Sequence, residues 1–157
     1  MNVSTAIARI KAAGHDISDE YTKERCLEFL NTALQQTSSL LISAKYPALV
    51  RETTLRQGDT VPENYMQSAG FYPLRMTNGS VEIVDDATEV RFRYWATPPL
   101  LTEDDKELPY QHDAINEVIV KAAIILALNE NEYDVSADNS ILTALQEAVS
   151  AAMSVQR

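Results

Sequence analysis

The side chains with the clearest potential for chemistry are four carboxylates clustered in the second half of the chain. They are Glu103, Asp104, Asp105 and Glu107. Hard cations such as Ca²⁺ and Mg²⁺ prefer oxygen ligands of this kind. The cluster lacks, however, the alternate-position spacing and the central glycine of a calcium-binding loop. We therefore interpret it as a solvated acidic loop that also caps the helix after it, and we expect no bound metal.

A second pair of carboxylates, Asp113 and Glu117, is spaced by about one helical turn. Two carboxylates at this spacing could act together in acid–base catalysis. No nucleophile and no further titratable group completes a site around them. An exposed helix face is therefore the favoured interpretation.

Other residues that could support catalysis or cofactor binding are sparse. Cys26 is the only cysteine, which excludes an intrachain disulfide and a cysteine-based zinc site, and its apolar neighbours indicate a buried thiol. His15 and His112 lie far apart, without metal-ligand spacing. Four glycines in total leave little material for a phosphate-binding loop. We predict that the chain is not an enzyme and has no cofactor.

The net charge of −10 is concentrated in the last third of the sequence. Residues 1–45 contain five basic and five acidic residues, residues 46–102 contain five and seven, and residues 103–157 contain three and eleven. A nucleic-acid groove needs clustered lysines and arginines. The charge distribution argues against such a groove, and it suits a surface that DNA passes without binding or one that meets a basic partner.

The sequence shows no sign of membrane insertion or export. The N-terminus lacks the basic and apolar regions of a signal peptide. The most apolar run, residues 118–128, is too short to span a bilayer and contains Lys121. We expect a soluble intracellular product with no membrane partner.

The length of 157 residues suits one domain, and we predict a single domain over 1–157. Its predicted class is α+β, mainly α: a helical bundle with a small inserted antiparallel β-sheet or hairpin region. Apolar residues recur at three- and four-residue spacing in four segments. These predict helices at about 3–13, 19–44, 110–129 and 138–153.

Local signals mark the ends of these helices. Ser18 is the predicted N-cap of the second helix, and Pro47 is predicted to stop it. Either Asp138 or Ser136 can cap the last one. The helix at 110–129 is apolar nearly all round, so we expect it to be buried on all sides, partly against neighbouring subunits.

The β-rich insertion is predicted at about residues 49–97. Runs rich in β-branched and aromatic residues alternate there with turn signals, and the expected strands are 50–57, 71–77, 80–84 and 89–96. Asn78-Gly79 is the strongest hairpin signal in the chain. For some of residues 58–70, an irregular loop is the alternative to a part of the sheet.

The candidate interface begins on the last of these strands. There, Arg91, Arg93 and Trp95 share one face, and Tyr94 lies on the other with Val90 and Phe92. Tryptophan, tyrosine and arginine dominate interface hot spots. For Trp95, a position in a small core is an equal alternative. The complete candidate interface is Arg91, Arg93, Tyr94, Trp95, Pro98, Pro99 and Leu100.

Several short motifs follow one another in order between about residues 20 and 130. They are Phe29-Leu30-Asn31-Thr32-Ala33, Val61-Pro62-Glu63-Asn64-Tyr65, the run from Tyr94 to Pro99, Leu101-Thr102-Glu103-Asp104-Asp105, and Leu108-Pro109 before an apolar helix. This ordered set resembles the head-to-tail connector proteins (adaptor or neck proteins) of tailed bacteriophages. Tyr46-Pro47 departs from the pattern, because such chains often carry a tryptophan shortly after the first long helix.

The resemblance implies a virion structural protein. Such adaptors form a homo-oligomeric ring, usually of twelve copies, beneath the portal at the capsid–tail junction, after synthesis in the host cytoplasm. Their partners are the portal protein and the next neck or tail protein, and DNA passes through without specific binding. The acidic residues Glu103, Asp104, Asp105 and Glu107 would then be candidate channel or loop residues.

Two other functions stay open. One is a stopper or tail-completion protein of the neck, one layer further from the capsid. The other, from a different class, is an acidic inhibitor or DNA mimic that occupies a basic nucleic-acid groove as a monomer or dimer.

Overall fold

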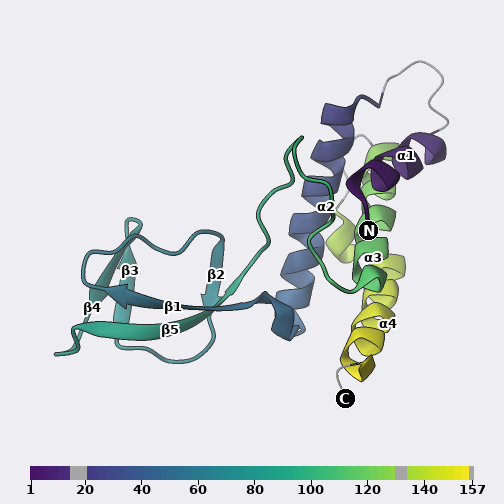
Figure 1. Cartoon of the computed structure of the whole chain (residues 1–157). Coiled ribbons are helices and arrows are strands. Elements are labelled where there is room, and N and C mark those ends of the chain that lie inside the picture. Colours follow the sequence, from purple (N-terminus) through teal and green to yellow (C-terminus); the bar gives the residue numbers. More distant parts are fainter. Residues whose placement is uncertain (15–20, 130–133, 156–157) are drawn as a thin grey trace. The chain divides into compact units, whose positions relative to one another are not determined.

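The computed structural model describes residues 1–14, 21–129 and 134–155, and its class is α+β (Figure 1). Along this part of the chain, helices precede and follow a run of five strands. The elements are α1 (Val3–Ala13), α2 (Lys23–Ser43), η1 (Pro47–Leu49), β1 (Val50–Arg56), β2 (Tyr65–Ser68), β3 (Leu74–Thr77), β4 (Ser80–Ile83), β5 (Glu89–Ala96), α3 (Asp113–Leu128), η2 (Val135–Ala137) and α4 (Asn139–Val155). No helix within the described ranges has both the length and the apolar character that a bilayer crossing requires.

The residues group into two compact units, where the sequence predicts a single domain. The first, the helical unit, comprises residues 1–40 and 100–157 and contains α1, α3, α4 and most of α2. The second, the sheet unit, is Leu41–Pro99 and contains the five strands. It includes the predicted β-rich insertion and begins earlier, because the last residues of α2 and the turn after them group with the strands.

Side-chain caps open the first and last helices close to the starts that the sequence predicts. Asn2 Oδ1 accepts a hydrogen bond from Ser4 N at 2.9 Å and opens α1. Asp138, one of the two predicted caps, accepts from Ser140 N at 2.8 Å and opens α4. Ser136, the other candidate, lies in η2 instead.

The second helix starts later than predicted. It begins at Lys23, because Thr22 Oγ1 accepts a hydrogen bond from Arg25 N at 3.2 Å and so caps the first turn. The predicted cap, Ser18, lies outside the described residues. The apolar residues at three- and four-residue spacing in this helix form its buried face: Cys26, Phe29, Leu30, Ala33, Leu34 and Leu41 are buried, and Leu40 is half-buried.

The same helix ends in a Schellman motif before Pro47 is reached. Lys45 adopts a left-handed φ of 59° and donates its N–H to the Ile42 carbonyl at 2.9 Å. Tyr46 donates its N–H to the Leu41 carbonyl at 2.9 Å. Tyr46 is buried, and this burial raises the pKa of its phenol.

In the helical unit, α3 packs against α1 and α4. It begins at Asp113 and not near residue 110, because the side chain of Asn116 accepts from Tyr110 N and donates to the Tyr110 carbonyl and so holds the preceding backbone. Most of α3 is buried, as its apolar composition predicts. Ile124 and Ile125 are half-buried, and Leu128 is exposed.

In the sheet unit, β5 is the central strand of an antiparallel sheet with the order β1-β5-β2, and β3 and β4 form a separate hairpin. The predicted turn at Asn78-Gly79 is confirmed: Thr77 pairs with Ser80, and the two turn residues have φ values of 52° and 78°. The short strand β2 falls in the region that the sequence leaves open. It has a register shift between Tyr65 and Gln67. This shift interrupts the alternation of side chains between the two faces, which is the pattern that identifies a strand in a sequence.

The core of the sheet unit forms on one face of β5. Phe92 is fully buried there with Leu55 and Val81. The ring of Phe92 stacks on Tyr94 with centroids 5.4 Å apart and meets Tyr72 edge-on at 5.0 Å. Val90 on the same face is buried as well, and Tyr94 is half-buried.

Candidate functional site

The residues that could act together in this chain lie along the acidic segment, which we define as residues 100–110 of the helical unit. This segment has no helix or strand of its own. Its path is instead set by three contacts with α2, α3 and the N-terminus. The helices therefore position the acidic side chains, and each contact is described in turn.

The first contact joins the start of the acidic segment to α2. Asn31 Nδ2 donates to the Leu101 carbonyl at 3.0 Å, and Asn31 Oδ1 accepts from Leu101 N at 2.7 Å. One amide side chain thus satisfies both backbone polar groups of a buried residue. Without it, these groups would be buried and unpaired.

The second contact repeats this arrangement at the other end of the segment. Asn116 of α3, which is fully buried, donates from Nδ2 to the Tyr110 carbonyl at 2.6 Å and accepts from Tyr110 N at 3.2 Å. The Tyr110 hydroxyl lies 2.6 Å from Ser38 Oγ of α2 and shares a hydrogen bond with it. The end of the segment is therefore held between α2 and α3.

The third contact is a short backbone pairing with the N-terminus. Val3 N donates to the Lys106 carbonyl at 2.9 Å, and Leu108 N donates to the Met1 carbonyl at 2.8 Å. These bonds lie on both sides of an antiparallel bridge between Asn2 and Glu107. The chain before α1 thus runs alongside the acidic segment.

The Met1 ammonium reinforces this pairing. It lies 2.7 Å from Asp113 Oδ1 and 3.3 Å from Glu107 Oε2. The hydrogen bond to Asp113 raises the pKa of the amino group, and the same bond, with a further one from Asn116, lowers the pKa of the Asp113 carboxyl. Glu117 lies in a separate ion pair with Arg9 at 2.7 Å. Asp113 and Glu117 are thus each paired with a cation of their own, which favours structural roles.

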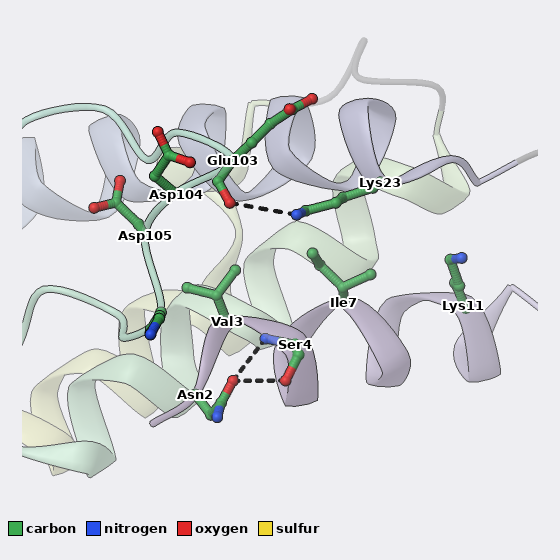
Figure 2. Close-up of a pocket in the computed structure, with 10 residues that line it drawn as sticks. Asn2, Val3, Ser4, Ile7, Lys11, Lys23, Glu103, Asp104 and Asp105 are labelled. Atoms are coloured by element: carbon green, nitrogen blue, oxygen red, sulfur yellow. Dashed lines mark hydrogen bonds between the residues drawn. The ribbon is translucent and has the colours of Figure 1, made fainter.

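The four predicted acidic residues are all exposed. Asp105 has a structural task, because its Oδ2 accepts from Thr102 N at 2.7 Å and its N–H returns to the Thr102 carbonyl at 3.2 Å. Figure 2 shows Glu103 and Asp104 beside a pocket of about 650 Å³, where Lys23 donates to the Glu103 carbonyl at 3.3 Å. Within the described ranges, no three His, Cys, Asp or Glu side chains are grouped to hold a metal ion.

The predicted interface residues do not form one exposed patch. Arg91 is exposed and pairs with Glu52 at 2.6 Å, and Arg93 is exposed too. Trp95 is only 9% exposed. Their strand ends before the double proline, and the rest of the set is mixed: Tyr94 is half-buried, Pro98 is buried, Pro99 is exposed and Leu100 is 50% exposed.

The sequence missed one conspicuous surface residue. Phe71, predicted to begin a strand, is 106% exposed in the loop between β2 and β3. The available signal was the flanking sequence, since Gly70 and Pro73 are turn formers on either side of it. The sequence also did not predict the contacts of Asn31 with Leu101 and of Asn116 with Tyr110, although Asn31 belongs to one of the motifs.

No protein-family model, curated protein sequence or solved structure matches this chain.

Proposed function

We propose that this chain is a structural head-to-tail adaptor of a tailed-phage virion. In that role it forms a ring under the portal, extends the DNA channel and docks the next neck or tail component. One observation carries the proposal: two motifs that are far apart in the sequence, and that resemble those of such adaptors, are hydrogen-bond partners in the helical unit.

One contact of the helical unit links two of the motifs. Asn31, in the first motif, binds Leu101, which opens the acidic motif. Leu108, in the Leu-Pro motif, donates instead to the Met1 carbonyl, which lies outside the set of motifs. Short motifs that occur by chance have no reason to be bonded to one another. Their contact therefore supports treating the ordered set as the signature of one structural unit.

The architecture is consistent with a part that meets neighbours on more than one side. In the proposal, the helices act as a small bundle, and the sheet unit inserted between α2 and α3 is a second contact module. The partners are the portal protein, the next neck or tail protein and further copies of this chain. By resemblance to such adaptors, the copies form a ring of twelve. The protein then resides at the capsid–tail junction of the virion.

The acidic segment suits a channel wall in this proposal. Glu103, Asp104, Asp105 and Glu107 are exposed, and the helical unit has seven basic residues against sixteen acidic ones. Like charges keep DNA phosphates from adhering. A ring in which these carboxylates lie on the outer surface, away from the channel, would contradict this part of the proposal.

The test is reconstitution with the portal protein encoded by the same phage genome. The purified chain and portal ring are mixed and imaged by electron cryo-microscopy. We expect a ring of this chain in direct contact with the portal. A ring that binds only beyond another neck protein would indicate the stopper role. No co-assembly, with tight binding of the monomer to a DNA-binding protein, would indicate the acidic mimic.

A matched pair of variants tests the channel separately from folding. Glu103→Gln combined with Asp104→Asn removes two exposed charges and leaves the Thr102–Asp105 turn intact. We expect normal rings that retain DNA more strongly at low salt. The control is Glu82→Gln with Asp86→Asn at exposed positions of the sheet unit, which removes the same charge and should leave DNA retention unchanged.

A further inference from the structure

Phe71 is held in an exposed position by a well-anchored loop. Its side chain is 106% exposed, whereas the other large apolar side chains of the described chain reach 58% at most. On one side of it, Ala69 N donates to the Arg93 carbonyl at 2.9 Å. On the other, the Tyr72 hydroxyl accepts from Arg93 N at 3.2 Å, and the Tyr72 ring packs against Phe92. The base of the loop is therefore anchored to the sheet core. The Phe71 side chain projects into solvent from this fixed backbone.

The helical unit has a groove that could receive such a projection. It lies between α2 and the start of the acidic segment and has a volume of about 600 Å³. Leu27, Leu100 and Leu101 supply its apolar lining, and Leu100 is 50% exposed. Three exposed carboxylates also line it: Glu24, Glu28 and Glu103.

Arg93 carries a charge complementary to the carboxylates of the groove, and the sheet unit is nearly neutral where the helical unit is strongly acidic. The sheet unit has six basic and seven acidic residues, against seven and sixteen in the helical unit. Arg93, at the base of the Phe71 loop, has an exposed side chain without an ion pair among the described residues, whereas Arg91 is paired with Glu52. An aromatic ring beside an unpaired guanidinium matches an apolar groove with carboxylates at its edge.

We propose that Phe71 of one copy docks into the α2 groove of a second copy, with Arg93 facing the glutamates of that groove. Projection and groove lie on different units of the same chain, so the contact is heterologous when each copy binds one neighbour through Phe71 and another through its groove, as the proposed ring requires. Repeated heterologous contacts close into a ring or extend into a filament. The inference rests on the proposed ring and names the surfaces that join neighbouring copies.

Cross-linking between two single-cysteine variants tests the contact. A Phe71→Cys chain is mixed with a Thr32→Cys chain, Thr32 being a half-buried residue of the groove. The native Cys26 is buried and stays in both chains. The Phe71→Cys chain keeps the anchored loop and Arg93, so its weakened docking still raises the local concentration of the two introduced thiols, and mild oxidation should trap the contact as a mixed disulfide dimer. The control replaces the first variant by Thr88→Cys, an exposed position in the loop before β5.

We expect the 71–32 dimer to exceed the control several-fold, with the linkage mapped by mass spectrometry. Phe71→Ala should lower the oligomer fraction in light scattering. The Tm should stay unchanged, because the exposed Phe71 side chain makes no contact with the core.

Three results would overturn the inference. Oligomers without the 71–32 linkage would leave the proposed ring standing and remove this contact. A disulfide within a single Phe71→Cys/Thr32→Cys chain, seen as a cross-linked monomer, would show that each groove is filled by its own Phe71. A chain that stays monomeric at every concentration, alone and with the portal ring, would reject both the contact and the proposed function.

Discussion

Asn31 and Leu101 are 70 residues apart in the sequence, and two hydrogen bonds join them through both backbone polar groups of Leu101. The asparagine amide takes the place of one residue of a neighbouring strand. It binds the acidic segment to α2 where no regular secondary structure is present. This contact is therefore the first to test by mutation.

We predict that Asn31→Ala lowers the free energy of unfolding by about 2–4 kcal/mol, because two hydrogen bonds are lost and a buried N–H and C=O remain unpaired. Asn31→Asp should have an intermediate effect, since a carboxylate can accept from Leu101 N but cannot donate to the Leu101 carbonyl. Urea unfolding followed by circular dichroism measures both. Gln35→Ala, at an exposed position of the same helix, is the control. Equal stability of Asn31→Ala and this control would contradict the prediction.

Local signals in the sequence were sufficient where one short motif determines the structure. The hairpin at Asn78-Gly79 needs only two residues that tolerate positive φ, and both are adjacent. The first helix and the apolar stripe of the second follow from spacing alone. The start of the second helix did not, because Thr22 and Ser18 are both good caps and nothing local decides between them.

The contacts of the candidate site could not be predicted in the same way. Asn116 lies in an apolar helix, and its partner is the backbone of Tyr110 in a segment without regular structure. No periodicity reports such a pairing. The exposure of Phe71 depends on how Tyr72 fills the sheet core, and a sequence pattern of β-type residues does not separate these two neighbours. Long-range contacts of single side chains were the missing information.

Thr37 and Ser38 are adjacent, fully buried hydroxyl residues of α2 with opposite predicted effects. The Thr37 hydroxyl has no hydrogen-bond partner among the described residues, so Thr37→Val removes an unpaired polar group at constant shape. We predict that it raises the free energy of unfolding by about 1 kcal/mol. Ser38→Ala leaves the Tyr110 hydroxyl without this partner and should lower the free energy by about 1–3 kcal/mol. Chemical unfolding of both variants measures the difference, and effects of the same sign would contradict the assignment.

The ion pair between Met1 and Asp113 predicts a specific dependence of stability on pH. The pKa of Asp113 lies below its ordinary value of 3.8, so its contribution is present above that value and is lost as the pH falls through the lowered pKa. The pKa of the Met1 amino group lies above 8.0, so its contribution is complete below pH 8.0 and is lost as the pH rises through the raised pKa. The pair therefore stabilises the fold most between these limits.

Asp113→Asn tests this window. Unfolding of the wild-type chain and the variant is compared at about pH 6 and on both sides of the window. The stability difference should be largest near pH 6 and should shrink in acid and in alkali. Added salt should reduce it, because the pair is exposed. Glu82→Gln, at an exposed position of the sheet unit, is the control. A difference that is constant across pH would assign the effect to the hydrogen bond with Asn116 alone.

Trp95 and Arg93 lie on the same strand, and the sequence left open whether Trp95 belongs to a core or to an interface. The tryptophan is only 9% exposed, whereas the arginine is exposed. We predict that Trp95→Ala lowers the free energy of unfolding by about 3–5 kcal/mol, as expected for a buried tryptophan. Arg93→Ala should change it by less than about 0.5 kcal/mol.

The assembly of the same two variants should show the reverse order of effects. Under conditions where both are folded, Arg93→Ala should reduce the fraction of oligomer, because it removes the charge that faces the glutamates of the groove. Trp95→Ala should reduce assembly only as far as it reduces the amount of folded chain. Unfolding curves and light scattering on the same samples separate the two quantities. A Trp95→Ala chain with unchanged stability and no assembly would make Trp95 an interface anchor.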